Sequence, residues 1–578
     1  MAGRDLPAGI DTSGRVRPED FVRGVVDSRA DHDWYRVEVD PGSYVVRVSG
    51  TGDRPLGNPL LILRDEDGRE VYRDHSRWGE ARIEGSIDER GTYYLDVSGL
   101  EPRSVGGRTL GHATGDYAVS LNRLDGTPVD AIAGTVWIEK PVVRVYFAPA
   151  GEKAAFGDGS VERSAGWNDY QVRRAMAALD AFSGVCDIGF RQTQRREAAD
   201  FPVLIAAEAV GWSGMFQPPG TIGEGNGVFA GGPFDVSLGL WGEGPGGGLE
   251  RGAYGWELML HEFGHGLGLA HPHDPGFGSV VMDGVGNWDD PGVFGLNSTR
   301  WTVMSYREAG LPDPQKLHGF ALGPMAFDIA ALQQSYGATR AHDGDDRYLL
   351  PHRNDLGTGY ACLWDTGGED TIRAGRTDRD VTIVLRDATL AYERGGGGFL
   401  SAADGVRGGF TIANGVAVEN AAGGDGDDTI VGNGLENRLA GGGGADEIRG
   451  GPGADLLHVG DDDARDLIVY RARYASGATV READRIAAFD PRSGPRETSW
   501  DRFDLTAIDG DRRAPGDQPL RFVEAFTAPG QGEPPAEARV ERQGGNTHVL
   551  IDLDGDGAHD MLLVVLDVAG LGADDFLL

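Results

Sequence analysis

Three histidines and one glutamate lie close together in a short apolar stretch of the chain. They are His261, Glu262, His265 and His271 in the pattern H-E-x-x-H-x-x-G-x-x-H, with Gly268 between the last two histidines. Residues four apart share one face of a helix, so His261 and His265 can hold one zinc ion with neutral imidazoles. Glycine tolerates a positive φ, so Gly268 lets the chain leave the helix sharply and return His271 to the same metal.

This set of side chains predicts hydrolysis at a metal. Three protein ligands leave one coordination position open, which a catalytic zinc needs. Glu262 projects beside the two helical histidines, where it can take a proton from the attacking water. A buried helix with incidental histidines would explain the leucines of the stretch, but not the histidine spacing, the glutamate and the glycine together. We therefore predict a zinc site made by His261, His265 and His271, with Glu262 as general base.

A second stretch supports the metal site. Met304 lies 33 residues after His271, in the sequence WTVMSY that ends at Tyr306. A methionine alone would be assigned to the core. With the zinc motif, the stretch resembles the Met-turn of the metzincin metalloproteases, in which the methionine forms an apolar floor beneath the metal. The proline after His271 and the stretch 324–337 are similar to serralysins specifically. The resemblance implies that Tyr306 is a movable zinc ligand whose hydroxyl helps to hold the developing oxyanion.

Composition limits the classes of function. The chain has 578 residues, a net charge of −37, 93 glycines and two cysteines. The length suffices for about three or four domains. The acidic balance argues against nucleic acid and anionic membrane as partners, and favours a solvated surface or calcium sites. Cys186 and Cys362 exclude a disulfide framework, and both one bridge and two separate thiols stay open. No apolar run has transmembrane length, and the N-terminal stretch lacks the apolar core of a cleavable signal peptide.

The first part of the chain predicts a β-sandwich. After a polar arm over residues 1–15, short alternating stretches separated by turn residues run from 16 to 126 and favour antiparallel sheets. Sequences at 31–35, 91–94 and 114–117 resemble the pre-peptidase C-terminal domain of secreted bacterial proteases. Binding of a carbohydrate or surface and a passive spacer role both stay open for this domain.

Residues 130–338 are expected to form the protease domain. Apolar residues at helical spacing predict a helix over 168–182, which Gly184 would end. Strands are expected at 142–147 and 203–206, and a last helix near 324–336. Glycine-rich loops within 211–256 lead into the zinc helix. The metzincin resemblance implies an α+β fold with a small mixed sheet backed by two helices.

Four units of nine residues then follow one another between residues 423 and 458. Three match G-G-x-G-x-D-x-U-x, whereas the second has Asn433, Leu435 and Asn437 in place of glycine, glycine and aspartate. A flexible glycine-rich linker would not keep this register. The units resemble the RTX repeats of the serralysins, in which two units complete one coil of a parallel β-roll. We expect the sixth residue of each unit to stack over that of the next coil, namely Asp428 over Asp446 and Asn437 over Asp455. Ile430, Leu439, Ile448 and Leu457 are expected to point inward.

The resemblance also implies calcium between the stacked turns and at an acidic segment upstream, for which a plain acidic hairpin is the alternative. Without the ion, the stacked aspartates repel one another, so the roll, over 339–470, should fold only with calcium bound. The calcium ligands expected are Gly344, Asp346, Asp365, Gly367, Gly368, Asp370, Gly424, Gly426, Asp428, Asn437, Gly442, Gly444, Asp446, Gly451, Gly453 and Asp455.

The last part, 471–578, is expected to form a β-rich cap. The acidic stretch 552–560 predicts a hairpin turn that could bind an ion weakly, because it lacks the twelfth-position acid of an EF-hand. The final residues, 574–578, combine aspartates with terminal apolar residues. They resemble the uncleaved C-terminal signal of type I secretion substrates, which implies export by that machinery and an extracellular location.

The expected fold class is multidomain: an antiparallel β-sandwich, an α+β metzincin domain and a parallel β-roll with its cap. The function that follows is a secreted, calcium-stabilised zinc metalloendopeptidase acting on proteins or peptides, as a monomer. The alternative is a calcium-binding adhesin or surface-binding protein with a latent or vestigial protease site; intact Glu262 and Tyr306 speak against it. A protease that cuts only itself or one partner stays open. Control by the N-terminal arm also stays open, although residues 1–185 contain no cysteine for a cysteine switch.

Overall fold

The protein is described here by a computed structural model of the full chain. It describes all residues except 1–7, 11, 18–19, 29, 51–55, 57, 76–79, 88–89, 101–102, 106–107, 111–113, 124–125, 157–160, 209–211, 222, 231–243, 310–316, 473–474, 493–499, 511–517 and 528–534. Part of the expected N-terminal arm and of the glycine-rich loops before the zinc helix therefore lies outside the described residues. Among the described residues, no helix is both long and apolar enough to cross a bilayer.

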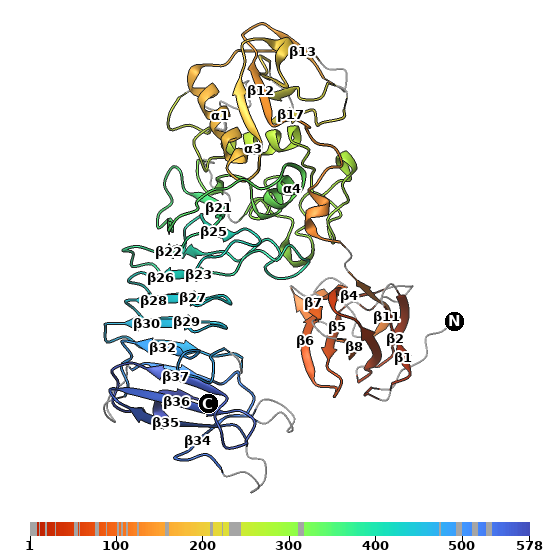
Figure 1. The fold of residues 1–578 in the computed structure, drawn as a ribbon. Coiled ribbons are helices and arrows are strands. Elements are labelled where there is room, and N and C mark those ends of the chain that lie inside the picture. Colours follow the sequence, from red (N-terminus) through yellow and green to blue (C-terminus); the bar gives the residue numbers. More distant parts are fainter. Residues whose placement is uncertain are drawn as a thin grey trace. The chain divides into compact units, whose positions relative to one another are not determined.

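The chain divides into two compact units (Figure 1). The first holds residues 1–130, 281–297 and 391–396, and the second holds residues 131–280, 298–390 and 397–578. Among the described residues, strands far outnumber helices and form several sheets, which agrees with the predicted β-roll toward the C-terminus. The four domain boundaries expected from the sequence stay predictions.

The first unit contains two β-sheets that share one apolar core. Their strand orders are β1-β3-β8-β5-β6 and β2-β11-β4-β7, and only the pair β1 and β3 is parallel. Buried Val37 and Leu95 of the first sheet lie in one cluster with Val48 and Val119 of the second. The strands are β1 (Gly14–Arg15), β2 (Asp20–Val26), β3 (Asp33–Val39), β4 (Gly42–Gly50), β5 (Pro59–Arg64), β6 (Glu70–His75), β7 (Glu80–Ile87), β8 (Gly91–Gly99) and β11 (Gly115–Arg123), beside a hairpin of β9 (Arg103–Val105) and β10 (Arg108–Leu110).

The second unit begins with a mixed sheet of order β15-β12-β16-β18-β17. Its strands are parallel except β17, which pairs antiparallel with β18 at the edge. The elements are β12 (Val142–Phe147), β15 (Gly189–Gln192), β16 (Phe201–Ile205), β17 (Gly214–Phe216), β18 (Gly227–Phe229), α1 (Asp169–Ser183), α3 (Tyr254–Gly266) and α4 (Ala326–Tyr336), with a small hairpin of β13 (Lys153–Ala155) and β14 (Val161–Arg163). The helices and strands predicted for this part of the chain are therefore present.

Helix α1 begins and ends where its sequence requires. The Asn168 side chain accepts the N–H of Gln171 at 2.9 Å, and the Gln171 side chain accepts the N–H of Asn168 at 3.0 Å. This reciprocal pair satisfies two N–H groups that the first turn would otherwise leave without partners. Gly184 follows the last residue and donates its N–H to Asp180 at 3.1 Å.

Helix α3 packs on the sheet through aromatic rings. Phe263 lies edge-on to Phe216 of β17 at 5.9 Å and to Phe229 of β18 at 5.7 Å between ring centroids. Gly266 lets the end of the helix come close, because a Cβ there would lie 2.6 Å from Phe216 and 2.8 Å from Phe201. Two residues later, Gly268 has φ +95°, and a Cβ there would lie 2.5 Å from the carbonyl oxygen of Val136. The sharp exit predicted at Gly268 is confirmed.

Past α4, two parallel ladders build the β-roll, whose strands follow one another as rungs in Figure 1. One ladder runs β20-β22-β26-β28-β30-β32 and continues into the antiparallel end strands β37-β36-β35; the other runs β23-β27-β29-β31-β33-β38. Ile430, Leu439, Ile448 and Leu457 are at most 1% exposed, so the predicted apolar interior is confirmed. The bounds are β20 (Arg347–Leu349), β21 (Gly359–Leu363), β22 (Thr371–Arg373), β23 (Val381–Val384), β24 (Ala402–Ala403), β25 (Gly409–Ile412), β26 (Asn420–Ala422), β27 (Thr429–Val431), β28 (Arg438–Gly442), β29 (Glu447–Arg449), β30 (Leu456–Gly460), β31 (Leu467–Val469), β32 (Asp484–Ala487), β33 (Arg502–Asp504), β34 (Arg521–Phe522), β35 (Glu537–Gln543), β36 (Asn546–Asp552), β37 (Met561–Val565) and β38 (Phe576–Leu577), and β19 (Phe320–Ala321) pairs with β21.

The close approach at Gly266 generates a stability prediction. Gly266→Ala adds about 1 kcal/mol of helix propensity, but it drives a methyl group into the Phe216 and Phe201 rings, and overpacking of this kind costs about 1–3 kcal/mol. We expect a net loss in the free energy of unfolding, measured by urea denaturation of the calcium-loaded chain. Gly434→Ala is the control, because a Cβ there meets no atom within 4 Å. A Gly266→Ala chain as stable as the wild type would contradict the packing described.

Candidate metal centre

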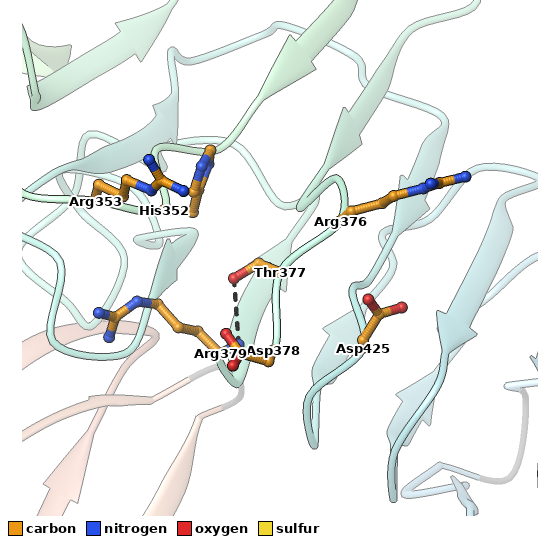
Figure 2. A pocket seen from close by; sticks show the side chains of 7 residues that line it. All are labelled: His352, Arg353, Arg376, Thr377, Asp378, Arg379 and Asp425. Atoms are coloured by element: carbon orange, nitrogen blue, oxygen red, sulfur yellow. Dashed lines mark hydrogen bonds between the residues drawn. The ribbon is translucent and has the colours of Figure 1, made fainter.

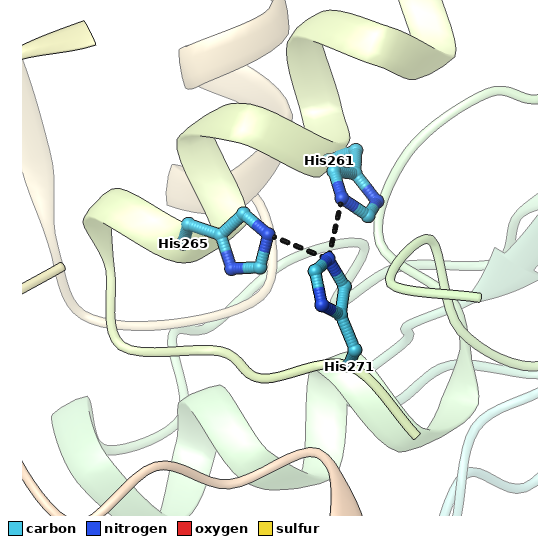
Figure 3. A group of neighbouring side chains, drawn as sticks. All are labelled: His261, His265 and His271. Carbon is cyan, nitrogen blue, oxygen red and sulfur yellow. Dashed lines mark hydrogen bonds between the residues drawn. The ribbon is translucent and has the colours of Figure 1, made fainter. Parts of the chain in front are cut away.

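The three predicted histidines converge on one point (Figure 3). His261 and His265 extend from α3, and His271 reaches the same point from the segment after the helix. The Nε2 atom of His271 lies 3.2 Å from that of His261 and 2.9 Å from that of His265. All three ligand atoms therefore lie within reach of a single ion.

The other ring nitrogens fix the tautomer of each imidazole. Every Nδ1 atom of the three rings lies at hydrogen-bond distance from an oxygen, so each Nδ1–H donates and each Nε2 carries a lone pair. The acceptors are the Val303 carbonyl for His261 at 2.8 Å, the Leu269 carbonyl for His265 at 2.9 Å and Asp274 Oδ2 for His271 at 2.9 Å.

Three lone pairs that face one another in a buried site call for a cation between them. A proton does not supply it readily, because burial lowers the pKa of His261 to about 4 and that of His271 to about 2, and also lowers that of His265. Tetrahedral zinc with bonds of about 2.1 Å to nitrogen places its ligand atoms about 3.4 Å apart, close to the spacing found here. The three side chains thus fit a zinc ion in geometry, tautomer and charge.

Glu262 lies buried beside the histidines on α3, at 5% exposure. Burial raises the pKa of its carboxyl to about 8, and a cation at the adjacent centre would favour the ionised form again. Its Oε2 atom has no hydrogen-bond partner in the part of the chain that the structure describes. Edge strand β17 passes next to it at Gly214, where a Cβ would lie 2.5 Å from Glu262 Oε1. The carboxyl is therefore unsatisfied and close to a sheet edge, as a proton-transfer group facing a substrate would be.

Tyr306 lies at the same centre. Its ring centroid is 4.8 Å from that of His271 and 5.4 Å from that of His261. Burial raises the pKa of the Tyr306 phenol to about 12, and the nearby Glu262 and Asp274 carboxylates add to the effect. The side chain is still 49% exposed, so it has room to move.

The Met-turn lies under the centre and is held by a residue that the sequence analysis missed. Met304 is fully buried, and its Sδ atom lies against Gly264 of α3. Buried Asp328 of α4 accepts hydrogen bonds from the Thr302 hydroxyl at 2.6 Å and from the Val303 N–H at 2.8 Å. It also accepts the N–H of Met325 at 2.9 Å. Because the Val303 carbonyl orients His261, Asp328 supports a metal ligand through the backbone of a single residue.

Two groups that support the metal ligands, Asp274 and Asp328, were not predicted from the sequence. Asp274 orients His271, and its only signal in the sequence is a position three residues after that histidine. Asp328 lies inside the stretch 324–337 but carries no motif of its own. Both are partners of ligands rather than ligands, so their roles depend on contacts that spacing does not encode.

The acidic segment upstream of the repeats brings its carboxylates together. Asp346, Asp365 and Asp370 offer oxygens within 4.8 Å of one another. Asp370 is buried, its Oδ2 atom has no hydrogen-bond partner among the described atoms, and burial raises its pKa to about 6. Gly368 lies against the carbonyl oxygen of Gly344, and Gly367 stands next to it in the same turn. The predicted upstream calcium ligands therefore share one place.

The repeat aspartates stack as expected. The Asp428 N–H donates to Asp446 Oδ1 at 2.8 Å, and the Asn437 N–H donates to Asp455 Oδ1 at 2.9 Å. One oxygen of each carboxylate is thus used within the stack, whereas Asp446 Oδ2 and Asp455 Oδ2 are buried without a partner in the described chain. Turn carbonyls of one coil face glycines of the next: Gly424 and Gly426 face Gly442 and Gly444, and Asn433 and Leu435 face Gly451 and Gly453.

The stack extends past the recognisable repeats. Asp446 donates its N–H to Asp466 Oδ1 at 2.8 Å, and Asp466 in turn donates to Asp501 Oδ1 at 3.0 Å. On the other side, Asp455 donates to Asp484 Oδ1 at 2.9 Å. The sequence between these aspartates breaks the period of nine, so the repeat pattern gave no signal for them.

Asn437 differs from the aspartates. Its Nδ2 atom donates to the Glu419 carbonyl at 2.9 Å and to Asn433 Oδ1 at 3.0 Å. Asn433 Nδ2 likewise donates to the Leu385 and Val418 carbonyls at 3.2 and 2.9 Å. Amide hydrogens thus face carbonyls that a calcium ion would otherwise need as ligands, and we leave Asn437 out of the calcium set proposed below.

The stretch 552–560 forms the turn between β36 and β37, as predicted. Asp552 accepts the N–H groups of Gly555 and Gly557 at 2.7 and 2.8 Å, and Asp560 accepts that of Leu553 at 2.7 Å. Asp552, Asp554 and Asp560 also offer oxygens within 4.8 Å of one another, so weak ion binding at this turn stays a prediction. Cys186 and Cys362 are both free thiols.

A polar pocket of about 420 Å³ lies among turns of the roll (Figure 2). Its three arginines outnumber its two aspartates, and none of its residues belongs to the predicted sites. The lining residues are His352, Arg353, Arg376, Thr377, Asp378, Arg379 and Asp425.

Comparison with known proteins agrees with the motifs. Residues 352–578 match the family described as Peptidase M10 serralysin C terminal. The resemblance to serralysins is confirmed. Metallopeptidase AprA of Pseudomonas marginalis is 33% identical over 194 residues, which cover 31% of this chain and 38% of that protein. Serralysin of Photorhabdus luminescens is 30% identical over 195 residues, 32% of this chain and 37% of that protein. Metalloprotease AprA of Pseudomonas entomophila is 33% identical over 335 residues, which cover 55% of this chain and 62% of that protein.

The chain spans less than two thirds of the length of each of these serralysin relatives. Among solved structures, the pre-peptidase C-terminal domain of a Bacillus anthracis collagenase is 15% identical and covers 19% of this chain and 93% of that domain, with a TM-score of 0.14. A score that low carries no argument, so the resemblance of residues 16–126 to that domain stays a prediction.

The link from Asp328 to His261 generates a prediction. Asp328→Asn replaces one accepting oxygen by an amide group that faces donors, which should cost about 2–4 kcal/mol of stability. The Met-turn should loosen, and zinc affinity should fall by roughly tenfold or more, as for other partners of metal ligands. Chemical denaturation and competition with a chromogenic chelator measure the two effects. Exposed Asp355→Asn is the control; equal zinc affinity in Asp328→Asn and the wild type would contradict the link.

The buried aspartates generate a pH prediction for the calcium-free chain. Burial, together with neighbouring carboxylates, raises the pKa of Asp446 to about 8, and burial raises that of Asp455 to about 7. Both values lie above those of an unfolded chain, about 3.9, so the calcium-free roll is most stable at low pH and loses stability as the pH rises from about 4 to about 8. Circular dichroism of the chelator-treated chain should therefore show more strand at pH 5.5 than at pH 8.5, where the calcium-free roll is expected to be unfolded. With saturating calcium the order should reverse; a calcium-free chain that gains strand as the pH rises would refute the prediction.

Proposed function

We propose that this protein is a secreted zinc endopeptidase of the serralysin type that is stabilised by calcium. The convergence of three imidazole lone pairs beside an unsatisfied, buried glutamate carries the proposal. The serralysin and AprA relatives support the same class of activity.

The proposed residues divide the work of peptide hydrolysis. His261, His265 and His271 would hold zinc, which when bound acidifies a water molecule and polarises the scissile carbonyl. Glu262 accepts the proton of the attacking water and passes it to the leaving amide nitrogen. The Tyr306 hydroxyl donates a hydrogen bond to the oxyanion as it develops. Strand β17, which passes Glu262 at Gly214, is the edge strand of its sheet among the described residues, and an extended peptide is proposed to lie along it.

Calcium is proposed to stabilise the roll rather than to take part in the chemistry. The carboxylates of Asp365 and Asp370 and of the stacked aspartates would bind it with turn carbonyls. These carboxylates include buried oxygens that lack partners in the described chain, which supports the assignment. The dependence on calcium also fits export in an unfolded state through type I secretion machinery and folding outside the cell.

The alternative, an adhesin whose protease site is vestigial, is less well supported. A vestigial site has no physical reason to keep Glu262 buried and unsatisfied, or to keep the three Nδ1 hydrogen bonds that orient the ligands. The protein is proposed to act as a monomer on protein or peptide substrates.

Glu262→Ala tests the proposal. The variant should keep zinc and the fold, but its rate of cleavage of an unfolded protein such as casein should fall by roughly 10²–10⁴-fold because proton transfer is lost. Metal content and near-ultraviolet circular dichroism verify that the site and fold are intact. Exposed Glu224→Ala, with the same change of charge, is the matched control.

Two results would count against the proposed function. Cleavage by zinc-loaded Glu262→Ala at the wild-type rate would show that another group carries the proton. Failure of the zinc- and calcium-loaded wild type to cleave casein or a library of unstructured peptides would favour the adhesin.

A further inference from the structure

We propose that His273 is the second hydrogen-bonding partner of Tyr306 and holds the phenol when it is away from the metal. The inference rests on the proposed function, because it concerns how a movable tyrosine is positioned at the metal centre. It gives a role to a histidine outside the three-histidine motif, two residues after His271.

His273 lies directly against the residues of the centre. Its ring stacks on that of His271, with 4.8 Å between centroids and 13° between planes. It also lies 4.7 Å from the Tyr306 ring at an angle of 53°, and the Tyr306 ring in turn lies 4.8 Å from that of His271, so the three rings contact one another. The His273 side chain is 11% exposed, so these rings and their surroundings cover most of it. The His273 imidazole thus contacts both a metal ligand and the phenol.

One nitrogen of His273 has no partner. Its Nε2 atom lies 3.6 Å from Asp274 Oδ2, an ionic neighbour that favours the proton on Nε2. The Nδ1 atom then carries a lone pair, and it is buried without a hydrogen-bond partner among the described residues. A buried acceptor without a donor costs free energy, so an arrangement that supplies the donor is favoured.

Tyr306 can supply that donor. Its hydroxyl makes no hydrogen bond within the described chain, although its ring packs against three imidazoles. A donor without an acceptor and an acceptor without a donor therefore occupy two rings in contact. Nearly half of the Tyr306 side chain is exposed, so packing does not lock the phenol in one position.

The pairing makes the position of Tyr306 an equilibrium between two partners. In one state the phenol oxygen is at the metal, and in the other the phenol O–H donates to His273 Nδ1. A substrate that needs the coordination position would shift the population toward the second state. His273 is in this sense a positioning residue: it lowers the cost of moving the phenol off the metal and leaves the proton transfers to other groups.

His273→Phe tests the pairing in the copper-loaded chain. Phenylalanine keeps the ring that stacks on His271 and removes the acceptor. A phenolate bound to Cu²⁺ gives a charge-transfer absorption band, which reports the fraction of Tyr306 at the metal. We expect the ratio of metal-bound to free phenol to rise about fivefold in His273→Phe, the effect of losing roughly one neutral hydrogen bond. The smaller variant His273→Leu should shift the band in the same direction.

Two control variants accompany it. Tyr306→Phe should abolish the band, and His352→Phe, which makes the same replacement outside the centre, should leave it unchanged. A band that is equal or weaker in His273→Phe overturns the proposal.

Binding of acetohydroxamic acid to the zinc-loaded chain gives a second readout. The ligand takes the coordination position, so it must displace the phenol. The dissociation constant of acetohydroxamic acid should rise up to about fivefold when His273→Phe is made in the wild-type background. It should not rise when His273→Phe is made in the Tyr306→Phe background. An equal rise in both backgrounds would mean that His273 acts on the ligand by itself, which overturns the proposal.

The outcomes separate this inference from the proposed function. If the wild type shows no phenolate band, Tyr306 is not a ligand and the pairing with His273 falls, while peptide hydrolysis through Glu262 is judged by casein cleavage alone. If the wild type does not cleave casein but the band responds to His273→Phe, the pairing holds and the protease assignment falls.

Discussion

The repulsion among three buried imidazole lone pairs is the constraint around which the metal centre is built. Each ring must be held with its proton on the outer nitrogen, so a carbonyl or carboxylate must stand behind it. Those acceptors come from the helix end, from Asp274 and from the Met-turn, and the Met-turn needs Asp328 of α4 to keep its place. The centre is therefore specified by a shell of hydrogen bonds around the histidines, and this shell joins parts of the chain more than sixty residues apart.

The β-roll also brings like groups together in a buried place, but these groups are carboxylates, which carry a negative charge when ionised. Its coils place carboxylates one above another, and burial raises their pKa values because the charged form has lost its water. In Asp446 and Asp455 one oxygen accepts a hydrogen bond from the backbone of the neighbouring coil, and the other is buried without a partner in the described chain, where the proposed calcium would bind. Where asparagine replaces aspartate, at Asn437, amide hydrogens take that place and the carbonyls of the preceding coil are satisfied without an ion. The same stacking geometry is therefore occupied by a neutral asparagine at Asn437 and by aspartates at the other positions.

How far the sequence predicted these features depended on whether a feature is local. The zinc helix, the exit at Gly268 and the stacking of Asp428 on Asp446 follow from spacing and period, which a single sequence displays directly. Spacing and period did not predict the roles of Asp328, Asp274 and the aspartates at 466, 484 and 501. Those roles arise from contacts between segments whose separation follows no period. Composition did not decide whether the two cysteines form a disulfide bond, and the structure shows them as free thiols. The division into compact units likewise depends on segments 281–297 and 391–396, which nothing in their sequence assigns to the first unit.

The hydrogen bonds between stacked aspartates give the roll a direction along its axis. The Asp428 N–H points to Asp446, that of Asp446 to Asp466, and that of Asp466 to Asp501, so each carboxylate is oriented by the coil before it. An ion that fixes one carboxylate also fixes the peptide that holds the next. Neighbouring sites in such a one-dimensional array are coupled, as are the repeats of a solenoid. If calcium binds as proposed, its binding to successive coils should be cooperative, and the folded fraction of the roll should respond steeply to the calcium concentration.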